Sequence, residues 1–249
     1  MRLDAPLERG EVALVGAGPG NPGLLTLAAA RLIAEADCIV HDALVSPEVL
    51  AMAAPHAERI FAGKRGGRPS AQQEDIIKTL IAKAREGRRV VRLKGGDPMV
   101  FGRGGEEVEG LLKAGVRVRV VPGVTAALAA AAWCGVPLTD RRAAVSVAFF
   151  PAREAVDSRI DWPACVRAHS TLVFYMASER YADVARALLS AGMGGDTPVL
   201  IAGKIGWPGA YAWRATLEEA AGAPRACPPP ALMIVGKVAA MGAQAELDR

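Results

Sequence analysis

Residues 92–107 read Arg-Leu-Lys-Gly-Gly-Asp-Pro-Met-Val-Phe-Gly-Arg-Gly-Gly-Glu-Glu, and the block continues a predicted buried strand at residues 89–93. The paired glycines after this strand would let a flat ligand approach the backbone without meeting a side chain. Asp97 offers a carboxylate suited to ribose hydroxyls, and Pro98 stiffens the loop. Because the block lacks the Gly-Lys-Ser/Thr ending of a phosphate-binding Walker loop, it indicates a nucleoside site.

The first glycine loop in chain order, Gly-Ala-Gly-Pro-Gly at residues 16–20, lies between a predicted strand at 11–15 and a predicted helix at 24–35, and the glycine-rich segment within 92–107 is the second glycine loop. A dinucleotide fingerprint would need its third glycine at position 21, which is Asn21. Pro19 also removes a backbone donor that a pyrophosphate would use. The loop therefore disfavours a nicotinamide dehydrogenase, and it leaves open whether it binds a ligand or only makes a tight turn.

Short β-like runs alternate with alanine- and leucine-rich helical patterns, which is typical of a mainly parallel α/β protein. Further strands are predicted at 38–41, 59–62, 117–121, 145–150, 171–175, 197–202, 210–216 and 231–235. Further helices are predicted at 47–52, 70–86, 106–114, 125–133 and 180–191. Because the pattern changes at about 137–143, we expect two unequal α/β domains, residues 1–138 and 139–249, with a ligand-binding cleft between them.

The composition excludes several classes of protein. Of the 249 residues, 51% are hydrophobic and 22% are charged, as expected for a globular protein. The apolar runs are too short to span a bilayer, and the first ten residues lack the apolar core of a signal peptide, so we expect a cytoplasmic protein. The four cysteines form no CxxC pair, so no metal site is predicted and the thiols are expected to be reduced.

The net charge of +4 is concentrated in short basic clusters at residues 64–68, 88–89, 92–94 and 141–142. Such clusters suit an anionic partner, although each could also be a solvated basic surface. Aromatic residues make up only 5% of the chain and do not interleave the clusters, so nucleic acid is not expected as a partner.

The chain resembles the uroporphyrinogen-III C-methyltransferases, class III S-adenosylmethionine methyltransferases of the tetrapyrrole methylase superfamily. The motifs that carry the resemblance are the block at 92–107 together with Val-Gly-Ala-Gly-Pro-Gly-Asn-Pro-Gly-Leu-Leu-Thr (15–26), Leu-Val-Ser-Pro-Glu (44–48), Gly-Lys-Arg (63–65), Val-Val-Pro-Gly-Val-Thr-Ala-Ala (120–127), Leu-Val-Phe-Tyr-Met (172–176) and, more loosely, Pro-Pro-Ala-Leu-Met-Ile-Val-Gly (229–236). The resemblance implies the two-domain tetrapyrrole methylase fold, a homodimer, and S-adenosylmethionine bound in the cleft, with S-adenosylhomocysteine as product. It places around the cofactor Pro19, Gly95, Gly96, Asp97, Val100, Thr125, Ala126 and Met176.

The resemblance implies methylation of uroporphyrinogen III at C2 and C7, giving precorrin-2 by way of precorrin-1. It puts Asp42 and Lys64 in the positions of catalytic base and acid. A carboxylate could accept the proton that the methylated macrocycle must lose, but Asp42 could equally cap a turn. Lys64 could protonate the substrate or attract an acetate or propionate side chain, and we favour attraction because an unshifted lysine is a poor acid.

The substrate implied by the resemblance carries eight carboxylates, which arginines can bind through two parallel hydrogen bonds. The candidates for this role are Arg65, Arg68, Arg103, Arg141 and Arg142. Arg103 could instead pair with Glu106 or Glu107, and Met176 could be a core residue at a strand end.

Three stretches of the second half depart from the family pattern. Asp140 replaces a histidine, residues 150–153 read Phe-Pro-Ala-Arg where Val-Thr-Gly-His is common, and residues 202–206 replace a Glu-Asn-Gly-Thr stretch. These changes leave two alternatives open: a methyltransferase for a different corrin-pathway tetrapyrrole, or a non-catalytic paralogue that binds a tetrapyrrole or nucleoside. The sequence also leaves open whether the product enters sirohaem or cobalamin biosynthesis.

Overall fold

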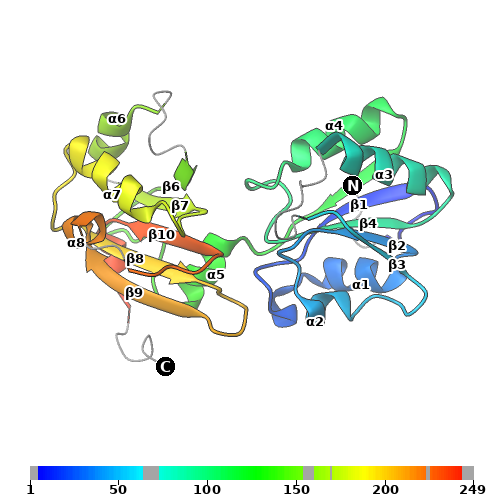
Figure 1. Cartoon of the computed structure of the whole chain (residues 1–249), viewed down its shortest axis with the longest axis horizontal. Helices are drawn as coiled ribbons and strands as arrows, with labels where there is room; N and C mark the ends of the chain where they lie inside the picture. The colour runs from blue at the N-terminus through cyan, green and yellow to red at the C-terminus, as the bar shows by residue number, and fades with distance from the viewer. Residues whose placement is uncertain (1–4, 64–72, 154–159, 169, 223–224, 243–249) are drawn as a thin grey trace. The chain divides into compact units, whose positions relative to one another are not determined.

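The computed structural model describes residues 5–63, 73–153, 160–168, 170–222 and 225–242 (Figure 1). The chain divides into two compact units, Met1–Thr125 and Ala126–Arg249. This division falls before the boundary at 138/139 expected from the sequence, because helix α5 (Ala126–Trp133) contacts strand β7 (Thr171–Tyr175) of the second unit. The units are therefore nearly equal in length.

The first unit is built on a five-stranded sheet in the order β3-β2-β4-β1-β5. The strands are β1 (Glu11–Gly16), β2 (Cys38–His41), β3 (Glu58–Phe61), β4 (Val90–Lys94) and β5 (Arg117–Val121). Every pair of neighbouring strands is parallel, so all five carboxyl ends lie at one edge of the sheet. The predicted strands are confirmed in this unit to within a residue at either end.

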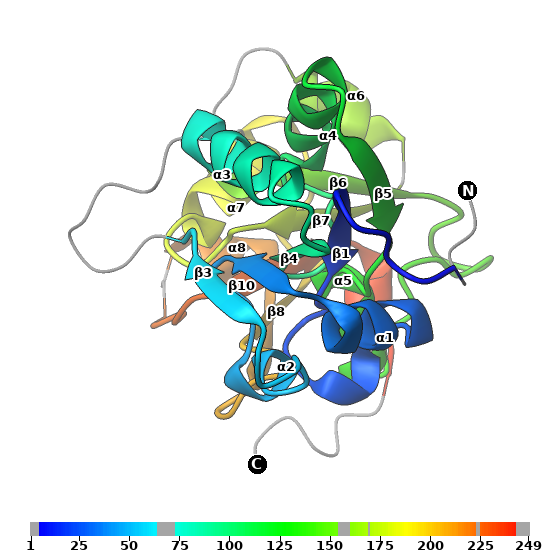
Figure 2. The same ribbon diagram turned by 90° about the vertical axis from the view of Figure 1, so that its right-hand side faces the viewer.

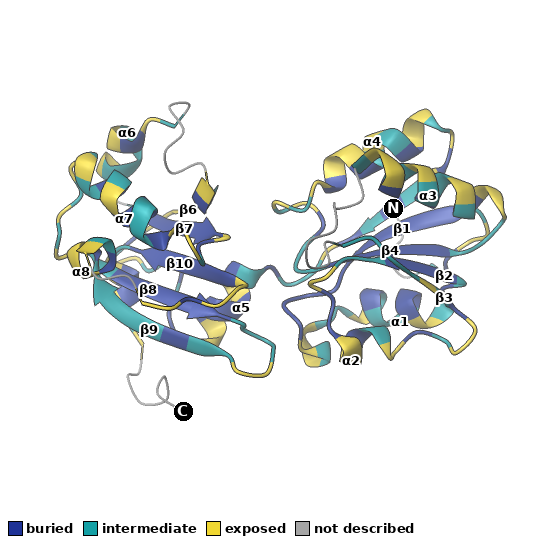
Figure 3. Cartoon of the chain, viewed as in Figure 1, coloured by how far each residue is buried: buried dark blue, intermediate teal, exposed yellow. Residues whose placement is uncertain are grey.

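Helices cover both faces of this sheet (Figure 2). On one face α1 (Leu27–Glu35) and α2 (Pro47–Leu50) pack against the strands through Leu32, Ile33 and Val49. On the other face α3 (Gln73–Arg85) and α4 (Gly104–Lys113) pack through Leu80 and Leu111. The central strands β1, β2 and β4 are buried, while the outer sides of the helices are exposed (Figure 3).

The helix after the first glycine loop begins later than predicted. A short 3-10 turn, η1 (Pro22–Leu24), is capped by the Asn21 side chain, and α1 starts only at Leu27, where Thr26 accepts a hydrogen bond from Ala29 N at 3.1 Å. The start at residue 24 is therefore wrong. Pyrophosphate binding in a dinucleotide fold requires an α-helix N-terminus directly after the glycine loop. Here η1 separates the loop from α1, so this requirement is not met.

The second unit contains a five-stranded sheet in the order β6-β7-β10-β8-β9. Its strands are β6 (Val147–Pro151), β7, β8 (Pro198–Gly203), β9 (Tyr211–Thr216) and β10 (Ala231–Val235). Only β6 and β7 are parallel, and the other three pairs are antiparallel. The expectation of a mainly parallel architecture is thus wrong for this unit, because the connection between β8 and β9 is too short for a helical crossover.

Three helices cover one face of the second sheet: α6 (Trp162–Arg167), α7 (Tyr181–Ser190) and α8 (Leu217–Gly222). Phe174, Ile201 and Met233 form the strand side of that core. Elsewhere in this unit α5 contacts β7, and η3 (Lys237–Ala240) contacts β8 and β10. The sequence did not predict α6 and α8, since six residues are too few to display a helical period. Within the described ranges, no helix has both the length and the apolar character needed to cross a membrane.

An ion pair joins the amino ends of two strands in the first unit. Asp37, just before β2, accepts hydrogen bonds from Arg89 N at 2.9 Å, Nε at 3.1 Å and Nη2 at 2.7 Å. The hydrogen bond from the Arg89 side chain is the main reason why the pKa of Asp37 is lowered to about 2. This carboxylate therefore stabilises the fold only while it is ionised.

We predict that Asp37→Asn lowers the free energy of unfolding at pH 7 by about 1 kcal/mol, since a charged acceptor becomes a neutral one. The folded pKa lies below the unfolded value of 3.8, so the wild-type advantage is complete above about pH 4 and disappears toward pH 2. Urea unfolding of both proteins between pH 7 and pH 2 measures this. Asp75→Asn, at an exposed position on α3, is the control; a difference that persisted at pH 2 would contradict the assignment.

Candidate functional site

The loops that follow β1, β4 and β5 meet at the carboxyl edge of the first sheet. Gly18 and Gly96 form a bridge, with Gly96 N donating to Gly18 O at 2.7 Å and Gly18 N donating to Gly96 O at 3.2 Å. Ala17 N also donates to Lys94 O at 2.7 Å. The two glycine-rich loops of the sequence are therefore hydrogen-bonded neighbours.

Side chains are excluded where these loops cross. A Cβ atom on Gly16 would lie 2.5 Å from Gly123 Cα, and a Cβ on Gly123 would lie 2.2 Å from Gly96 O. Both clashes are with backbone, which cannot rotate away. Gly123 belongs to the Pro-Gly turn after β5, and its part in this crossing was not predicted, because only the tertiary structure brings position 123 against positions 16 and 96.

Asp97 ties the second glycine loop to the turn after β5. Its Oδ2 accepts from Gly123 N at 3.0 Å and its Oδ1 accepts from Met99 N at 2.8 Å. An ionised carboxylate has about four acceptor positions, so Asp97 keeps capacity for a ribose hydroxyl. The residue thus anchors the loop as well as offering an acceptor.

The surface next to Asp97 is suited to a flat ligand. Gly96 has a φ of +67°, and a Cβ there would make only an ordinary van der Waals contact, with Thr125 Cα at 3.9 Å, so no neighbouring atom blocks that side of Gly96. Gly95 and Gly96 are half-buried. The structure brings together, on the loops at this edge, Pro19, Gly95, Gly96, Asp97, Val100 and Thr125.

The two remaining predicted cofactor residues lie in the second unit. Ala126 begins α5, and Met176 follows β7 with an exposed side chain and a φ of +57°. A positive φ is strained for a residue with a side chain, and such strain is concentrated at functional sites. The conformation of Met176 therefore favours a role at a site over the core role that the sequence left open.

Asp42 lies at the carboxyl end of β2, beside the second glycine loop. Its Oδ1 accepts from Leu44 N at 2.9 Å, and its Oδ2 accepts from Gly95 N at 3.4 Å. The turn-capping interaction with Leu44 is present, whereas α2 itself is capped by Ser46. Asp42 therefore serves the turn and also reaches the loop that carries the candidate cofactor residues. The predicted partner Lys64, together with Arg65 and Arg68, lies outside the described residues.

The three described candidate arginines are exposed, and two are paired with carboxylates. Arg103 donates to Glu106 through Nε at 2.8 Å and Nη2 at 2.6 Å, the partner that the sequence offered as an alternative. Arg142 donates to both oxygens of Asp140 at 2.9 Å, and these contacts lower the pKa of Asp140 to about 2. The charge of Asp140 is thus largely offset by Arg142. Arg141 is exposed beside them.

The basic cluster at 92–94 is wrong as an anion-binding surface, and the arginines at 88–89 are already paired with carboxylates. Arg88 and Arg89 pair with Glu58 and Asp37 respectively. Arg92 and Lys94 are buried beneath α4, where both donate to Glu107. The sequence feature that could have predicted this burial is the two-residue period of a strand, which places Arg92 and Lys94 on the face covered by α3 and α4.

Among the described residues, no group of three or more His, Cys, Asp or Glu side chains is arranged to hold a metal ion. The four cysteines are free thiols, and Cys38, Cys134 and Cys227 are buried. Burial raises the pKa of Cys38 and of Cys134 to about 11, as expected for unreactive core residues.

Comparison with known proteins gives concordant results. The family model for tetrapyrrole (corrin/porphyrin) methylases matches residues 11–221. A siroheme synthase of Edwardsiella ictaluri is 50% identical over 197 residues, 79% of this chain and 43% of the relative, and the chain spans about half the length of the siroheme synthases it matches. A uroporphyrinogen-III C-methyltransferase of Sinorhizobium sp. is 44% identical over 237 residues, 93% of this chain and 85% of the relative.

The solved structures include a uroporphyrin-III C-methyl transferase from Thermus thermophilus complexed with S-adenyl homocysteine. It aligns with a TM-score of 0.77 and 42% identity, covering 92% of this chain and 98% of that chain. Its two-domain fold is the fold described above. The chain therefore belongs to the family of the tetrapyrrole (corrin/porphyrin) methylases.

Proposed function

We propose that this chain transfers methyl groups from S-adenosylmethionine to C2 and C7 of uroporphyrinogen III, giving precorrin-2 by way of precorrin-1. The observation that carries the proposal is the meeting of the backbone surface at Gly16, Gly96 and Gly123 with two carboxylates, Asp42 and Asp97, at one edge of the first sheet. The motif block at 92–107 and the relatives described above support uroporphyrinogen III as the substrate.

S-Adenosylmethionine supplies an electrophilic sulfonium methyl group and leaves as S-adenosylhomocysteine. The residues that would hold it are Pro19, Gly95, Gly96, Asp97, Val100, Thr125, Ala126 and Met176. The unblocked side of Gly96 fits a flat group, and Asp97 retains acceptor positions for ribose hydroxyls. Holding donor and acceptor in line supplies much of the rate of such a transfer.

Asp42 is the proposed base that accepts a proton from the methylated substrate. Methylation of an electron-rich pyrrole carbon leaves a cationic macrocycle, which must lose a proton to restore neutrality. Each Asp42 oxygen accepts one backbone hydrogen bond, from Leu44 N or from Gly95 N, so both keep a lone pair for that proton. The backbone contacts orient the carboxylate.

The arginines and Lys64 hold the substrate carboxylates in this proposal. Arg141 is exposed beside the Asp140–Arg142 pair and offers its charge directly. Arg103 and Arg142 each already share a carboxylate, so a substrate carboxylate would join or exchange with Glu106 or Asp140. Lys64, Arg65 and Arg68 keep the substrate-binding roles expected from the sequence. The homodimer implied by the resemblance is also part of this proposal.

Incubation with uroporphyrinogen III and methyl-labelled S-adenosylmethionine tests the proposal. We expect two labelled methyl groups per macrocycle and a product with the mass and absorption of precorrin-2. If a parallel incubation labels only another corrin-pathway tetrapyrrole, that tetrapyrrole is the substrate instead of uroporphyrinogen III. A protein that binds S-adenosylhomocysteine but labels no tetrapyrrole would be a binding paralogue.

Asp42→Asn should lower turnover about 10²–10⁴-fold, the usual contribution of a positioned general base. The dissociation constant for S-adenosylhomocysteine, measured by calorimetry, should stay within about twofold, because the carboxamide oxygen of the variant keeps the shorter hydrogen bond from Leu44 N and only the 3.4 Å contact from Gly95 N is lost. Asp75→Asn is the matched control with unchanged turnover. Full activity of the Asp42→Asn enzyme would remove Asp42 from the mechanism.

Gly96→Ala should weaken S-adenosylhomocysteine binding at least about tenfold, because its methyl group would occupy the unblocked side of Gly96. Gly115→Ala is the control, since Gly115 also has a positive φ (+71°) with nothing within 4 Å of its Cβ. Both substitutions should cost about 1–2 kcal/mol of stability through backbone strain. Equal affinities of the two variants for S-adenosylhomocysteine would show that the cofactor does not bind next to Gly96.

A further inference from the structure

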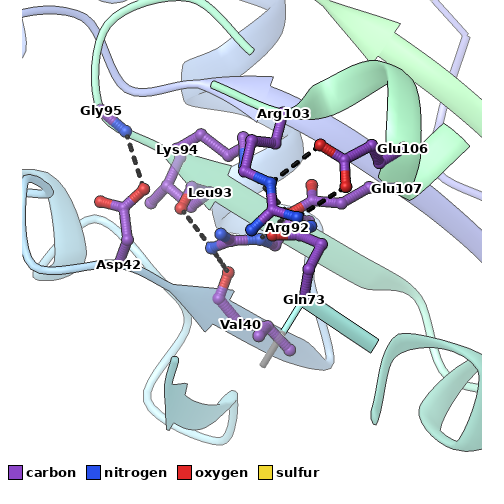
Figure 4. A network of polar contacts seen from close by, with 10 residues as sticks. All are labelled: Val40, Asp42, Gln73, Arg92, Leu93, Lys94, Gly95, Arg103, Glu106 and Glu107. Atoms are coloured by element: carbon purple, nitrogen blue, oxygen red, sulfur yellow. Dashed lines mark hydrogen bonds and ion pairs between the residues drawn. The ribbon is translucent and has the colours of Figure 1, made fainter. Parts of the chain in front are cut away.

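A buried cluster of charges lies directly beneath the second glycine loop (Figure 4). Glu107, in the first turn of α4, is fully buried, and its Oε1 accepts from Arg92 Nε at 3.2 Å, Lys94 Nζ at 2.9 Å and Gln73 Nε2 at 2.9 Å. Arg92 Nη1 also donates to Val40 O at 3.3 Å and to Leu93 O at 3.2 Å. A single carboxylate therefore connects β4, α4 and the start of α3.

The cluster connects the residues on either side of the loop from Gly95 to Gly104. Arg92 and Lys94 are on β4, immediately before Gly95, and Glu107 follows Gly104 at the start of α4. Between them lie four of the candidate cofactor residues: Gly95, Gly96, Asp97 and Val100. The ion pairs between Glu107 and Lys94 or Arg92 thus hold together the two points where this loop leaves and re-enters regular structure.

The loop needs such a constraint because its backbone is not intrinsically favoured. Phe101 and Arg103 have φ values of +51° and +57°, which are strained for residues with side chains. Conformations of this kind cost about 1–3 kcal/mol each and persist only when the surrounding structure imposes them. The bridge between Gly96 and Gly18 holds the start of the loop, and Asp97 holds its middle through Met99 N. Gly104 N donates to Pro98 O at 3.1 Å, but none of these contacts ties the start of α4 to β4.

Stability alone does not account for the cluster. Two cations face one carboxylate, and Glu107 Oε2 has no hydrogen-bond partner among the described residues. Burial, reinforced by the neighbouring Arg92, lowers the pKa of Lys94, while Glu107 and Asp42 oppose that shift. Apolar residues of similar volume are often as stabilising as a buried ion pair, or more so. A buried cluster of this kind is therefore weak evidence for stability, and it leaves the geometry of the loop as the feature to which it can contribute.

We propose that Glu107 is a positioning residue which, by holding Lys94 and Arg92, fixes the loop from Gly95 to Gly104 in its cofactor-binding conformation. This inference rests on the proposed function, since it assigns the loop to S-adenosylmethionine. The same clamp sets the backbone of Gly95, whose N–H reaches Asp42. Glu107 need not touch cofactor or substrate to have this effect.

The test compares Glu107→Gln with Glu109→Gln. Glu109 is an exposed glutamate of the same helix, paired with Lys113. Calorimetry should show S-adenosylhomocysteine binding about tenfold weaker for Glu107→Gln, because the loop must then be ordered on binding, and unchanged for Glu109→Gln. In the methyltransfer assay, KM for S-adenosylmethionine should rise while kcat at saturating cofactor stays within about threefold, a separation that reduced stability alone would not produce.

A second variant covers the case in which Glu107→Gln unfolds because it leaves two cations unneutralised. Combining Arg92→Met, Lys94→Met and Glu107→Leu removes all three charges, and its Tm should stay within about 5 °C of wild type. We expect this folded variant also to bind S-adenosylhomocysteine about tenfold more weakly. Wild-type affinity in either folded variant would overturn the role of Glu107, whereas absence of binding by the wild-type protein would instead overturn the proposed function.

Discussion

Close contact between backbone segments at the carboxyl edge of the first sheet is the constraint on which the site depends. Gly16, Gly96 and Gly123 come from three loops, and a side chain at position 16 or 123 would overlap neighbouring backbone atoms. Paired hydrogen bonds between Gly18 and Gly96 then join the loops into one surface. Because that surface is made of backbone rather than side chains, a flat ligand can lie close to it, and the loops cannot shift independently.

Strand β4 connects this surface to the interior. Its two faces differ: Val91 and Leu93 pack into the apolar core beneath α1, whereas Arg92 and Lys94 meet Glu107 beneath α4. The apolar face supplies stability through burial, and the charged face supplies directional contacts that define where the following loop begins. A central strand with one charged face is costly, and here the charge lies where loop geometry matters most.

The stretches that depart from the family pattern lie at strand ends and turns of the second unit. Asp140 forms an isolated bridge with Ala144 and neutralises Arg142, so its negative charge is compensated locally. Pro151 ends β6, and Lys204 follows β8 with a φ of +53°. The core of this unit retains ordinary apolar packing, so these departures bear on what the site accepts rather than on whether the chain folds.

The sequence by itself determined most of the local structure. Alternating apolar runs placed every strand of the first sheet, and the motifs at 15–26 and 92–107 indicated the methylase family, because turn chemistry and strand periodicity are encoded locally. It did not determine strand direction in the second sheet, because pairing depends on which distant strands become neighbours.

Only the tertiary structure decided which polar residues are buried and what they contact. Arg92 and Lys94 looked like an exposed basic cluster, yet α4 covers them and supplies Glu107 from thirteen residues after Lys94. Gly123 looked like an ordinary turn residue until the fold placed it against Gly16. In both cases the deciding contact joins segments that are separate in sequence, and a local pattern carries no information about such a partner.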